Sequence, residues 1–418
     1  MRLGPAWVAA LLAAADVGIP PQPLKPSEVG LQRTIAPLWD PYGAEFSPDG
    51  RLLAVACGTE VRLYGTQAWK EVARLRGASE NLLSVTFSPD GKMLAAGGFQ
   101  GGVVLWDLEE GRVRRTLAGH RAYVAALAFH PDGRRLLTAS HDGTARLWDA
   151  KEGRELRAVG SGGAVFVAAA FSRDGSRAAL AGAGLRVFRT DRWREEPGPA
   201  VAEEGWLAVG FRPDGRRGWV AGDRSVLVWE AGVGVPAREV VCVPESAALT
   251  AAQLSPDGRF WAAGSQDGAL RFFDAGGESP PTVLAHHQGP VRAVAVDPRG
   301  RCVVTIGRDR HIKVWGRVPA GVARLRPKGF CGIRVEQEES GRVVIVEVIA
   351  GTPADAAGLR RGDVVRKVAG TPVATPTDSV DLIGSFLEGE EVEIEVERGG
   401  QARAVRVTLG RRPAGLEN

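Results

Sequence analysis

Short apolar runs with partial alternation recur along most of the chain, separated by turns rich in glycine, proline and aspartate. In one stretch, YVAALAF (123–129) precedes a turn, RRLLTAS (134–140) follows it, and the aromatic run ARLWD (145–149) comes next. Alternation of apolar and polar positions over runs of this length indicates half-buried β-strands. The pattern therefore predicts a mainly β protein built from short strands.

A turn phrase marks each unit of this pattern. It reads FSPDG (46–50), FSPDG (87–91), FHPDG (129–133), FSRDG (171–175), FRPDG (211–215), LSPDG (254–258) and VDPRG (296–300). The final glycines stand at 50, 91, 133, 175, 215, 258 and 300, so successive phrases lie 40 to 43 residues apart. Proline fixes φ, aspartate bonds the nearby backbone, and glycine takes the left-handed position that closes the turn. Seven copies at a near-constant period predict a repeat architecture with a hairpin in every unit.

Each unit ends in an aromatic run, in chain order VRLYG, VVLWD, ARLWD, LRVFR, VLVWE, LRFFD and IKVWG. Four strands in a unit of about 42 residues are typical of a β-propeller blade. The third unit, from Gly119-His120 to Trp148-Asp149, resembles the WD40 family, and the resemblance extends over residues 30–317. It implies a seven-bladed WD40 β-propeller.

The resemblance also predicts how the ring closes, because this family lends an early strand to its last blade. The segment LQRTIAPL (31–38) matches VRRTLAGH (113–120) in phase. We therefore expect Leu31–Ala36 to form the outer strand of the blade that ends at Trp315. Closure leaves few free sheet edges.

One set of four side chains occurs in two units at the same offsets. The two sets are His120, Thr138, Asp142 and Trp148, and His287, Thr305, Asp309 and Trp315. A hydroxyl, an imidazole and a carboxylate suit a nucleophilic triad. The WD40 resemblance implies instead a buried hydrogen-bonded tetrad that holds a blade together. A single active site would need the set only once, so we favour the structural interpretation.

No phosphate-binding loop, metalloprotease or nucleophile-elbow motif is present, and we predict neither enzymatic activity nor a cofactor.

The stretch AGTPADAAGLRRGDVV (350–365) resembles the helix-and-turn segment of PDZ domains of the bacterial protease-associated type. Upstream, GFCGI (329–333) matches the loop that opens the ligand-binding strand of that family. A strand at 343–349, a strand at 363–370, a helix near Asp378–Leu387 and two final strands complete the expected order. A small α+β PDZ domain is therefore expected over 328–412.

The PDZ resemblance implies a peptide-binding groove. The backbone N–H groups of Cys331, Gly332 and Ile333 would converge on a peptide's terminal carboxylate, and the peptide would add a strand beside Ile333–Val335. The expected groove residues are Phe330, Cys331, Gly332, Ile333, Val335, Val380 and Ile383. The family's histidine at the helix start has no counterpart among Thr377, Asp378 and Ser379, so we expect a preference for apolar C-termini. The alternative is a degenerate PDZ domain that only packs on the propeller.

Composition limits the other function classes. The net charge of +4 over 418 residues is mild and does not favour nucleic-acid binding. The cysteines Cys57, Cys242, Cys302 and Cys331 lack metal-ligand spacing, so no metal site is predicted. No segment approaches the length of a membrane span.

The N-terminus, MRLGPAWVAALLAAADVG, fits either a secretory signal or a disordered tail over 1–29. A signal would place the protein in the periplasm or outside the cell; otherwise it is cytoplasmic. The remaining segments are a linker at 318–327 and a tail at 413–418.

The sequence as a whole predicts a non-catalytic, bacterial-type interaction scaffold with protein partners. The propeller would be a rigid platform, and its loops offer aromatic and arginine side chains suited to an interface: Trp39, Phe99, Arg121, Arg224, Arg308 and Arg310. The rival hypothesis is a substrate-delivery or regulatory subunit of a separate protease. The oligomeric state and the identity of the partner stay open.

Overall fold

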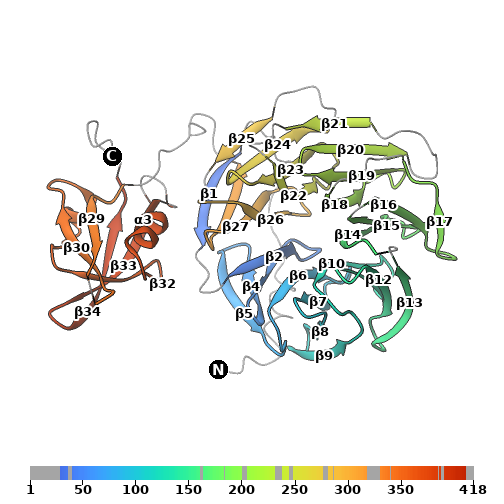
Figure 1. The fold of residues 1–418 in the computed structure, drawn as a ribbon, viewed down its shortest axis with the longest axis horizontal. Helices are drawn as coiled ribbons and strands as arrows, with labels where there is room; N and C mark the ends of the chain where they lie inside the picture. Colours follow the sequence, from blue (N-terminus) through green and yellow to red (C-terminus); the bar gives the residue numbers. More distant parts are fainter. Residues whose placement is uncertain are drawn as a thin grey trace.

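The computed structural model describes residues 29–35, 40–160, 163–182, 184–199, 205–230, 238–243, 248–275, 281–285, 287–317, 330–338, 340–384, 386 and 390–410. Residues 1–28 of the candidate signal or tail, the candidate linker, the C-terminal tail and Trp39 fall outside these residues, whereas Val29 belongs to a strand. Within them the chain is mostly strand, with one ring of sheets and one smaller C-terminal domain (Figure 1).

Seven four-stranded antiparallel sheets form within the described residues, one for each turn phrase. The first three are β2 (Pro41–Phe46), β3 (Leu52–Cys57), β4 (Glu60–Gly65) and β5 (Lys70–Leu75); β6 (Leu82–Phe87), β7 (Met93–Gly98), β8 (Val103–Asp107) and β9 (Arg112–Leu117); and β10 (Val124–Phe129), β11 (Arg135–Ser140), β12 (Thr144–Asp149) and β13 (Arg154–Gly160). The next two are β14 (Phe166–Phe171), β15 (Arg177–Gly182), β16 (Gly184–Arg189) and β17 (Arg194–Glu196); and β18 (Trp206–Phe211), β19 (Arg217–Gly222), β20 (Ser225–Glu230) and β21 (Arg238–Cys242). The last two are β22 (Leu249–Leu254), β23 (Phe260–Ser265), β24 (Ala269–Asp274) and β25 (Thr282–Ala285); and β26 (Val291–Val296), β27 (Cys302–Gly307), β28 (Ile312–Arg317) and β1 (Val29–Ile35).

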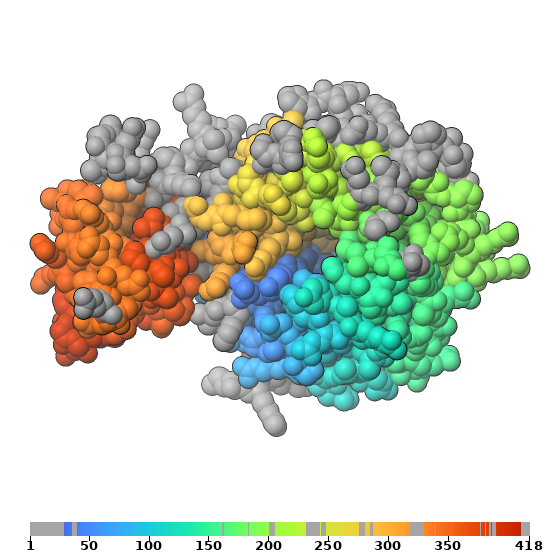
Figure 2. Space-filling model, viewed as in Figure 1, coloured from blue at the N-terminus to red at the C-terminus, as the bar shows by residue number. Residues whose placement is uncertain are grey.

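The first strands of the sheets, from β2 to β26, contact one another in cyclic order, which is the arrangement of a propeller. The colours of the space-filling view follow the ring in the same order (Figure 2). Consecutive sheets pack through apolar clusters, and the largest fully buried side chains include Trp106, Trp261 and Trp315. The mainly β propeller architecture that the sequence predicts is confirmed.

The turn phrases have the predicted conformation. All seven final glycines have φ between 65° and 71°, the left-handed region that favours glycine. In the first phrase the Asp49 carboxylate accepts hydrogen bonds from the Ser47 hydroxyl at 2.6 Å and from the Arg51 N–H at 3.0 Å.

The predicted closing strand is also confirmed. β1 pairs with β28 in antiparallel register, with Leu31 opposite Trp315, although it begins at Val29 and ends at Ile35.

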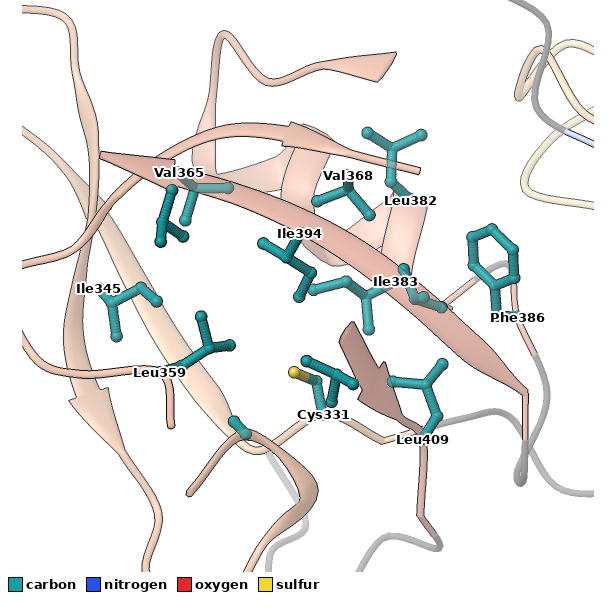
Figure 3. Packing of buried hydrophobic residues seen from close by; sticks show 14 of the residues in the cluster. Cys331, Ile345, Leu359, Val365, Val368, Leu382, Ile383, Phe386, Ile394 and Leu409 are labelled. Carbon is teal, nitrogen blue, oxygen red and sulfur yellow. The ribbon is translucent and has the colours of Figure 1, made fainter. Parts of the chain in front are cut away.

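The C-terminal domain contains a sheet in the order β29 (Ile333–Gln337), β30 (Val343–Val348), β31 (Val364–Val368), β33 (Glu391–Arg398) and β34 (Gln401–Thr408), with β32 (Thr371–Pro372) paired to β31. Two short helices, α2 (Pro353–Ala356) and α3 (Pro376–Gly384), accompany it. Buried side chains from the sheet and both helices form one core, with Ile345, Val368 and Ile394 fully excluded from solvent (Figure 3).

Helix α3 ends at Gly384, before the expected Leu387, and it starts before the expected Asp378 because a cap fixes its start. The Asp378 carboxylate accepts from the N–H groups of Ala374 and Thr375 at 2.9 Å, and the Asp378 N–H donates to the Thr375 hydroxyl at 3.2 Å. This reciprocal box, with Pro376 at the first helical position, sets the start of the helix. The domain contacts the propeller where the rings of His311 and Phe386 lie 5.8 Å apart.

A carboxylate and an amide occupy the same position in two propeller blades. Glu45 directly precedes the first turn phrase, and Gln253 directly precedes the sixth. The Gln253 side chain accepts a hydrogen bond from the Val296 N–H of the next blade at 2.8 Å, and Glu45 accepts from the Phe87 N–H of its own next blade. Burial raises the pKa of Glu45 to about 7, although hydrogen bonds from Thr86 and Phe87 act in the opposite direction. Both side chains therefore link the inner strands of neighbouring blades.

Replacing Glu45 with glutamine is expected to stabilise the propeller in a pH-dependent way. The folded pKa lies above the unfolded value, so the wild-type chain is favoured at low pH and loses stability as the pH rises from about 4.5 to 7. At pH 8, Glu45→Gln should raise the free energy of unfolding by roughly 1–2 kcal/mol, since partial exposure to the channel lowers the penalty. The gain should shrink towards pH 5.

Tryptophan fluorescence during urea unfolding measures this effect, because all 11 tryptophans precede residue 318. The reciprocal variant Gln253→Glu is the control and should lose stability at pH 8 more than at pH 5. A gain for Glu45→Gln that is the same at both pH values would contradict this assignment.

Candidate peptide-binding groove and propeller face

The strand β29 is an edge of the C-terminal sheet. Within the described residues it pairs with β30 along one side only, and α3 lies near it. Ile333 and Val335 are half-buried against the domain core, whereas Arg334 and Glu336 between them are exposed. An edge strand presents a row of N–H and C=O groups to which an extended peptide can add.

The loop before β29 makes backbone hydrogen bonds to two other segments of the domain. Phe330 and Gly410 exchange two backbone hydrogen bonds, with N–O distances of 2.8 and 3.0 Å. The carbonyls of Cys331 and Gly332 accept from Ala354 and Ile349, each at 2.9 Å. Cys331 is buried, and its side chain belongs to the domain core (Figure 3).

This loop leaves backbone donors without a partner. In the described part of the chain, the N–H groups of Cys331 and Gly332 have no protein acceptor. Gly332 has φ of 90°, and a Cβ at this position would collide with the Thr352 side chain. Consecutive backbone N–H groups around a left-handed residue make a concave site for an anion.

The two predicted pocket residues on α3 differ in their surroundings. Val380 is 61% exposed, so its side chain is open to a ligand, whereas Ile383 is 7% exposed and packs in the domain core. Asp378 caps the helix, and the buried Ser379 hydroxyl donates to the Pro376 carbonyl at 2.7 Å. These two polar side chains at the helix start are therefore already engaged.

The stretch 350–365 is joined to β33 through the Asp363 carboxylate. Asp363 is fully buried, and its carboxylate accepts two hydrogen bonds from Arg398, at 2.6 and 2.7 Å, and one from the Arg360 N–H at 2.9 Å. Arg398 also donates to the Gly358 carbonyl at 2.8 Å. Burial acts to raise the pKa of Asp363, but the hydrogen bonds from Arg398 and Arg360 outweigh it and leave the pKa below its usual value. This ion pair ties the turn after α2 to β33.

The structure brings together the members of both predicted tetrads. His120 Nδ1 lies 2.9 Å from Asp142 and Nε2 lies 2.7 Å from the Thr138 hydroxyl, which accepts from the Trp148 indole N–H at 2.9 Å. In the last blade the corresponding distances are 2.9, 2.7 and 2.8 Å, in the set His287, Thr305, Asp309 and Trp315. Both threonines are fully buried, so neither hydroxyl is accessible to a substrate.

The charge states in the tetrads follow from the same geometry. Burial lowers the pKa of His120 and of His287, although each aspartate partner acts to raise it. Burial acts to raise the pKa of Asp142 and Asp309, but their hydrogen bonds prevail and lower both pKa values. Each tetrad is therefore a neutral imidazole held by an ionised carboxylate. In the second blade the Trp106 indole N–H donates instead to the Arg76 carbonyl at 2.8 Å.

Of the predicted propeller-face residues, Phe99 contacts two other aromatic rings. Its ring lies 5.1 Å from that of Tyr42 and 5.0 Å from that of Tyr123. Arg310 forms an ion pair with Asp40 at 3.2 Å. Arg121, Arg224 and Arg308 belong to loops on three different blades, and all three are exposed.

Sequence reasoning missed Tyr42, Tyr123 and His141, which extend the aromatic contacts of Phe99. A signal was present, because Phe99 follows Gly91 at the same distance as His141 follows Gly133 and Arg308 follows Gly300. In each of these three blades the residue lies in the loop between the second and third strands.

Sequence profiles of two families match the chain. The profile of the WD domain, G-beta repeat, matches residues 69–107, 111–149, 240–274 and 278–316, and the PDZ domain profile matches residues 329–409. The chain carries WD40 repeats and a PDZ domain. Its WD40 and PDZ domains indicate a role in protein interaction.

Curated relatives match one domain or the other. The chain is 31% identical over 112 residues to the WD repeat-containing protein VIP3 of Arabidopsis thaliana, covering 22% of this chain and 35% of that protein. It is 34% identical over 70 residues to a probable periplasmic serine endoprotease DegP-like of Ectopseudomonas mendocina, covering 17% and 15%. It is 40% identical over 78 residues to the magnetosome formation protease MamE of Magnetospirillum gryphiswaldense, covering 18% and 10%.

The chain thus spans about a third or less of the length of these relatives. The protease relatives match only in the PDZ region, and no catalytic domain is matched. Among the described residues, no group of three His, Cys, Asp or Glu side chains could hold a metal ion, and no helix is long and apolar enough to cross a membrane.

Replacing His120 with alanine is expected to weaken the propeller without harming partner binding. The change breaks hydrogen bonds to Asp142 and Thr138, so the free energy of unfolding should fall by at most about 3 kcal/mol. Urea unfolding followed by tryptophan fluorescence measures the loss. A large loss of binding at unchanged stability would show that the tetrad of the WD40 blade has another role.

Replacing Asp363 with asparagine is expected to destabilise the PDZ domain by about 2–4 kcal/mol, because the buried Asp363 carboxylate loses the charge that holds the partly exposed Arg398. Amide hydrogen exchange of residues 340–384 in the full chain should then accelerate. The matched control is Glu397→Gln on the same sheet. It removes the charge that pairs with Arg366, and because Glu397 is more exposed than Asp363 the change should cost less than about 1 kcal/mol. Equal exchange in both variants would mean that the buried pair is unimportant.

Proposed function

We propose that this chain is a non-catalytic interaction scaffold whose PDZ domain binds the C-terminal end of a partner protein by strand addition. The propeller is a rigid platform that presents a second binding face. One observation carries the proposal: the Cys331 and Gly332 N–H groups have no acceptor in the described residues and lie beside the free edge of β29. A terminal carboxylate satisfies such donors, and the preceding residues pair with β29.

The exposed side chain of Val380 on α3 supports a preference for apolar C-terminal residues. Val380 is exposed to the extent of 61%, while Asp378 and Ser379 are engaged in capping and backbone hydrogen bonds. With no free polar side chain among these to read a ligand hydroxyl, apolar C-terminal residues are the preferred ligands. Two sites on one chain then gain from effective concentration when a partner engages both.

A second candidate function rests on the relatives. Several of them are named as serine proteases and match this chain through the PDZ region. In this alternative, the chain delivers substrates to a separate protease or regulates it. Purification of the chain with its native partners distinguishes the two, because the alternative requires a protease among them.

Fluorescence anisotropy with the full chain tests the main proposal. A short labelled peptide with an apolar C-terminal residue should bind when its carboxylate is free. Amidation should weaken binding at least about ten-fold, since it removes charge-assisted hydrogen bonds to the Cys331 and Gly332 amides.

The variant Val380→Glu should weaken binding by a similar factor. Val283→Glu, a change at a valine that is 44% exposed on the propeller, is the matched control and should have no effect. Equal binding of the free and amidated peptides would overturn the proposal.

A further inference from the structure

The last propeller blade meets the PDZ domain through the loop between β27 and β28. In this loop the ring of His311 lies 5.8 Å from the ring of Phe386, and the two meet edge to face. Both side chains are buried, His311 to 1% and Phe386 to 7% exposure. Edge-to-face ring pairs stabilise a contact beyond the area that they bury. Phe386 also belongs to the PDZ core and stands at the rim of that cluster, so it joins the core to the propeller (Figure 3).

The loop that carries His311 differs from the corresponding turns of two other blades. Residues 142–144 read Asp-Gly-Thr and residues 267–269 read Asp-Gly-Ala, whereas residues 309–311 read Asp-Arg-His. Arg310 has φ of 64°, where both counterparts have glycine at 79°. This left-handed conformation is uncommon for a residue with a side chain. The last blade therefore departs from the repeat in the turn that meets the PDZ domain.

Hydrogen bonds hold this turn in a fixed position. The Asp309 carboxylate lies 2.9 Å from His287 Nδ1 in the tetrad and accepts from the His311 N–H at 3.1 Å. The Gly307 N–H donates to the His311 carbonyl, also at 3.1 Å. The propeller thus presents the His311 ring as a preorganised docking point, and little ordering entropy opposes docking.

Helix α3 lies between the PDZ sheet and the propeller (Figure 1). It contacts β29, the strand that forms the other wall of the groove. Phe386 follows the last turn of α3, and its N–H donates to the Ile383 carbonyl at 3.2 Å. The contact between Phe386 and His311 therefore braces α3 from the propeller side.

The deeper part of the groove is filled in this docked arrangement. Val380 is exposed, but Ile383, one turn further along α3, is 7% exposed, and Ile333 of β29 is half-buried against the same core. A ligand's last side chain needs room at Ile383, so α3 has to move away from β29 to admit it. Such a movement goes towards the propeller, and the contact of Phe386 with the rigid turn opposes it.

We propose that docking on the last blade holds the peptide groove closed, so that docking and peptide binding exclude each other. A C-terminal peptide that opens the groove displaces Phe386 from His311. Conversely, release of the domain raises its affinity for the peptide, because coupling between two equilibria is reciprocal. Only the undocked fraction binds, and the apparent affinity falls by that fraction. This inference rests on the proposed function and adds its regulation.

Anisotropy with the full chain and a labelled peptide that has an apolar residue and a free carboxylate at its C-terminus tests the inference. His311→Thr introduces the residue type that the third blade carries at position 144, so the turn is expected to fold. Loss of the ring pair should tighten peptide binding by about three- to ten-fold. The matched control is His141→Thr, at an exposed histidine in the corresponding loop of the third blade, and it should leave binding unchanged. Tryptophan fluorescence during urea unfolding verifies that each variant is folded.

A second measurement needs no variant. The chain has six histidines, and NMR spectra of the full chain resolve their ring protons. The ring current of Phe386 acts on the His311 ring at the observed distance. Saturating free-carboxylate peptide should therefore shift the His311 ring protons and leave those of His141 unmoved. The amidated peptide should shift neither.

Two results would overturn the inference. One is peptide binding by His311→Thr that is equal to or weaker than that of the wild-type chain, and the other is an unmoved His311 resonance at saturation. If both chains bind the free-carboxylate peptide equally, the docking inference fails alone and the proposed function stands. If neither chain binds it, the proposed function fails as well.

Discussion

The pairing of β1 with β28 closes the propeller, and the rest of the platform depends on it. The register places Val29 opposite Arg317 and Leu31 opposite Trp315, so the strand ladder joins residues from the two ends of the ring. Val29 is buried in the same apolar cluster as Trp315, which adds burial to the backbone hydrogen bonds. The entropic cost of closing such a long loop grows only slowly with its length. The pairing also covers the edge of β28 and leaves the seven-residue β1 as the outer strand of that sheet.

A closed ring gives fixed positions to loops that lie far apart in the sequence. Phe99 and Tyr123 come from different blades and keep their ring contact because the sheets beneath them pack together. The links between inner strands made by Glu45 and Gln253 act in the same way. A surface that spans three blades is therefore preorganised, and binding to it costs little ordering entropy.

The PDZ sheet has two edges with different properties. Beside β29 lie unpartnered amides and the open Val380. The opposite edge, β34, carries the exposed side chains of Arg403 and Arg406, and charged residues on an edge strand discourage pairing with other chains. The Asp363–Arg398 pair holds the turn after α2 against β33. The groove thus combines one free edge with an anion site at its end.

Much of the fold could be predicted because its signals are local. The turn phrases, their left-handed glycines and the closing strand follow from the spacing of a few residues, and the loop 329–333 marks the start of β29. The predicted start of α3 was wrong because the Thr375–Asp378 cap decides where the helix begins. The ring contacts of Phe99 escaped prediction because Tyr42 and Tyr123 occupy no shared repeat position, and only the packing of three blades brings them to Phe99.

The most direct test of the central claim is a backbone amide NMR titration of the full chain with a peptide that has an apolar residue and a free carboxylate at its C-terminus. The account predicts large shifts for the amides of Cys331 and Gly332 and along Ile333–Gln337, with small shifts at β34. Saturable binding that leaves the Cys331 and Gly332 amides unmoved would contradict it.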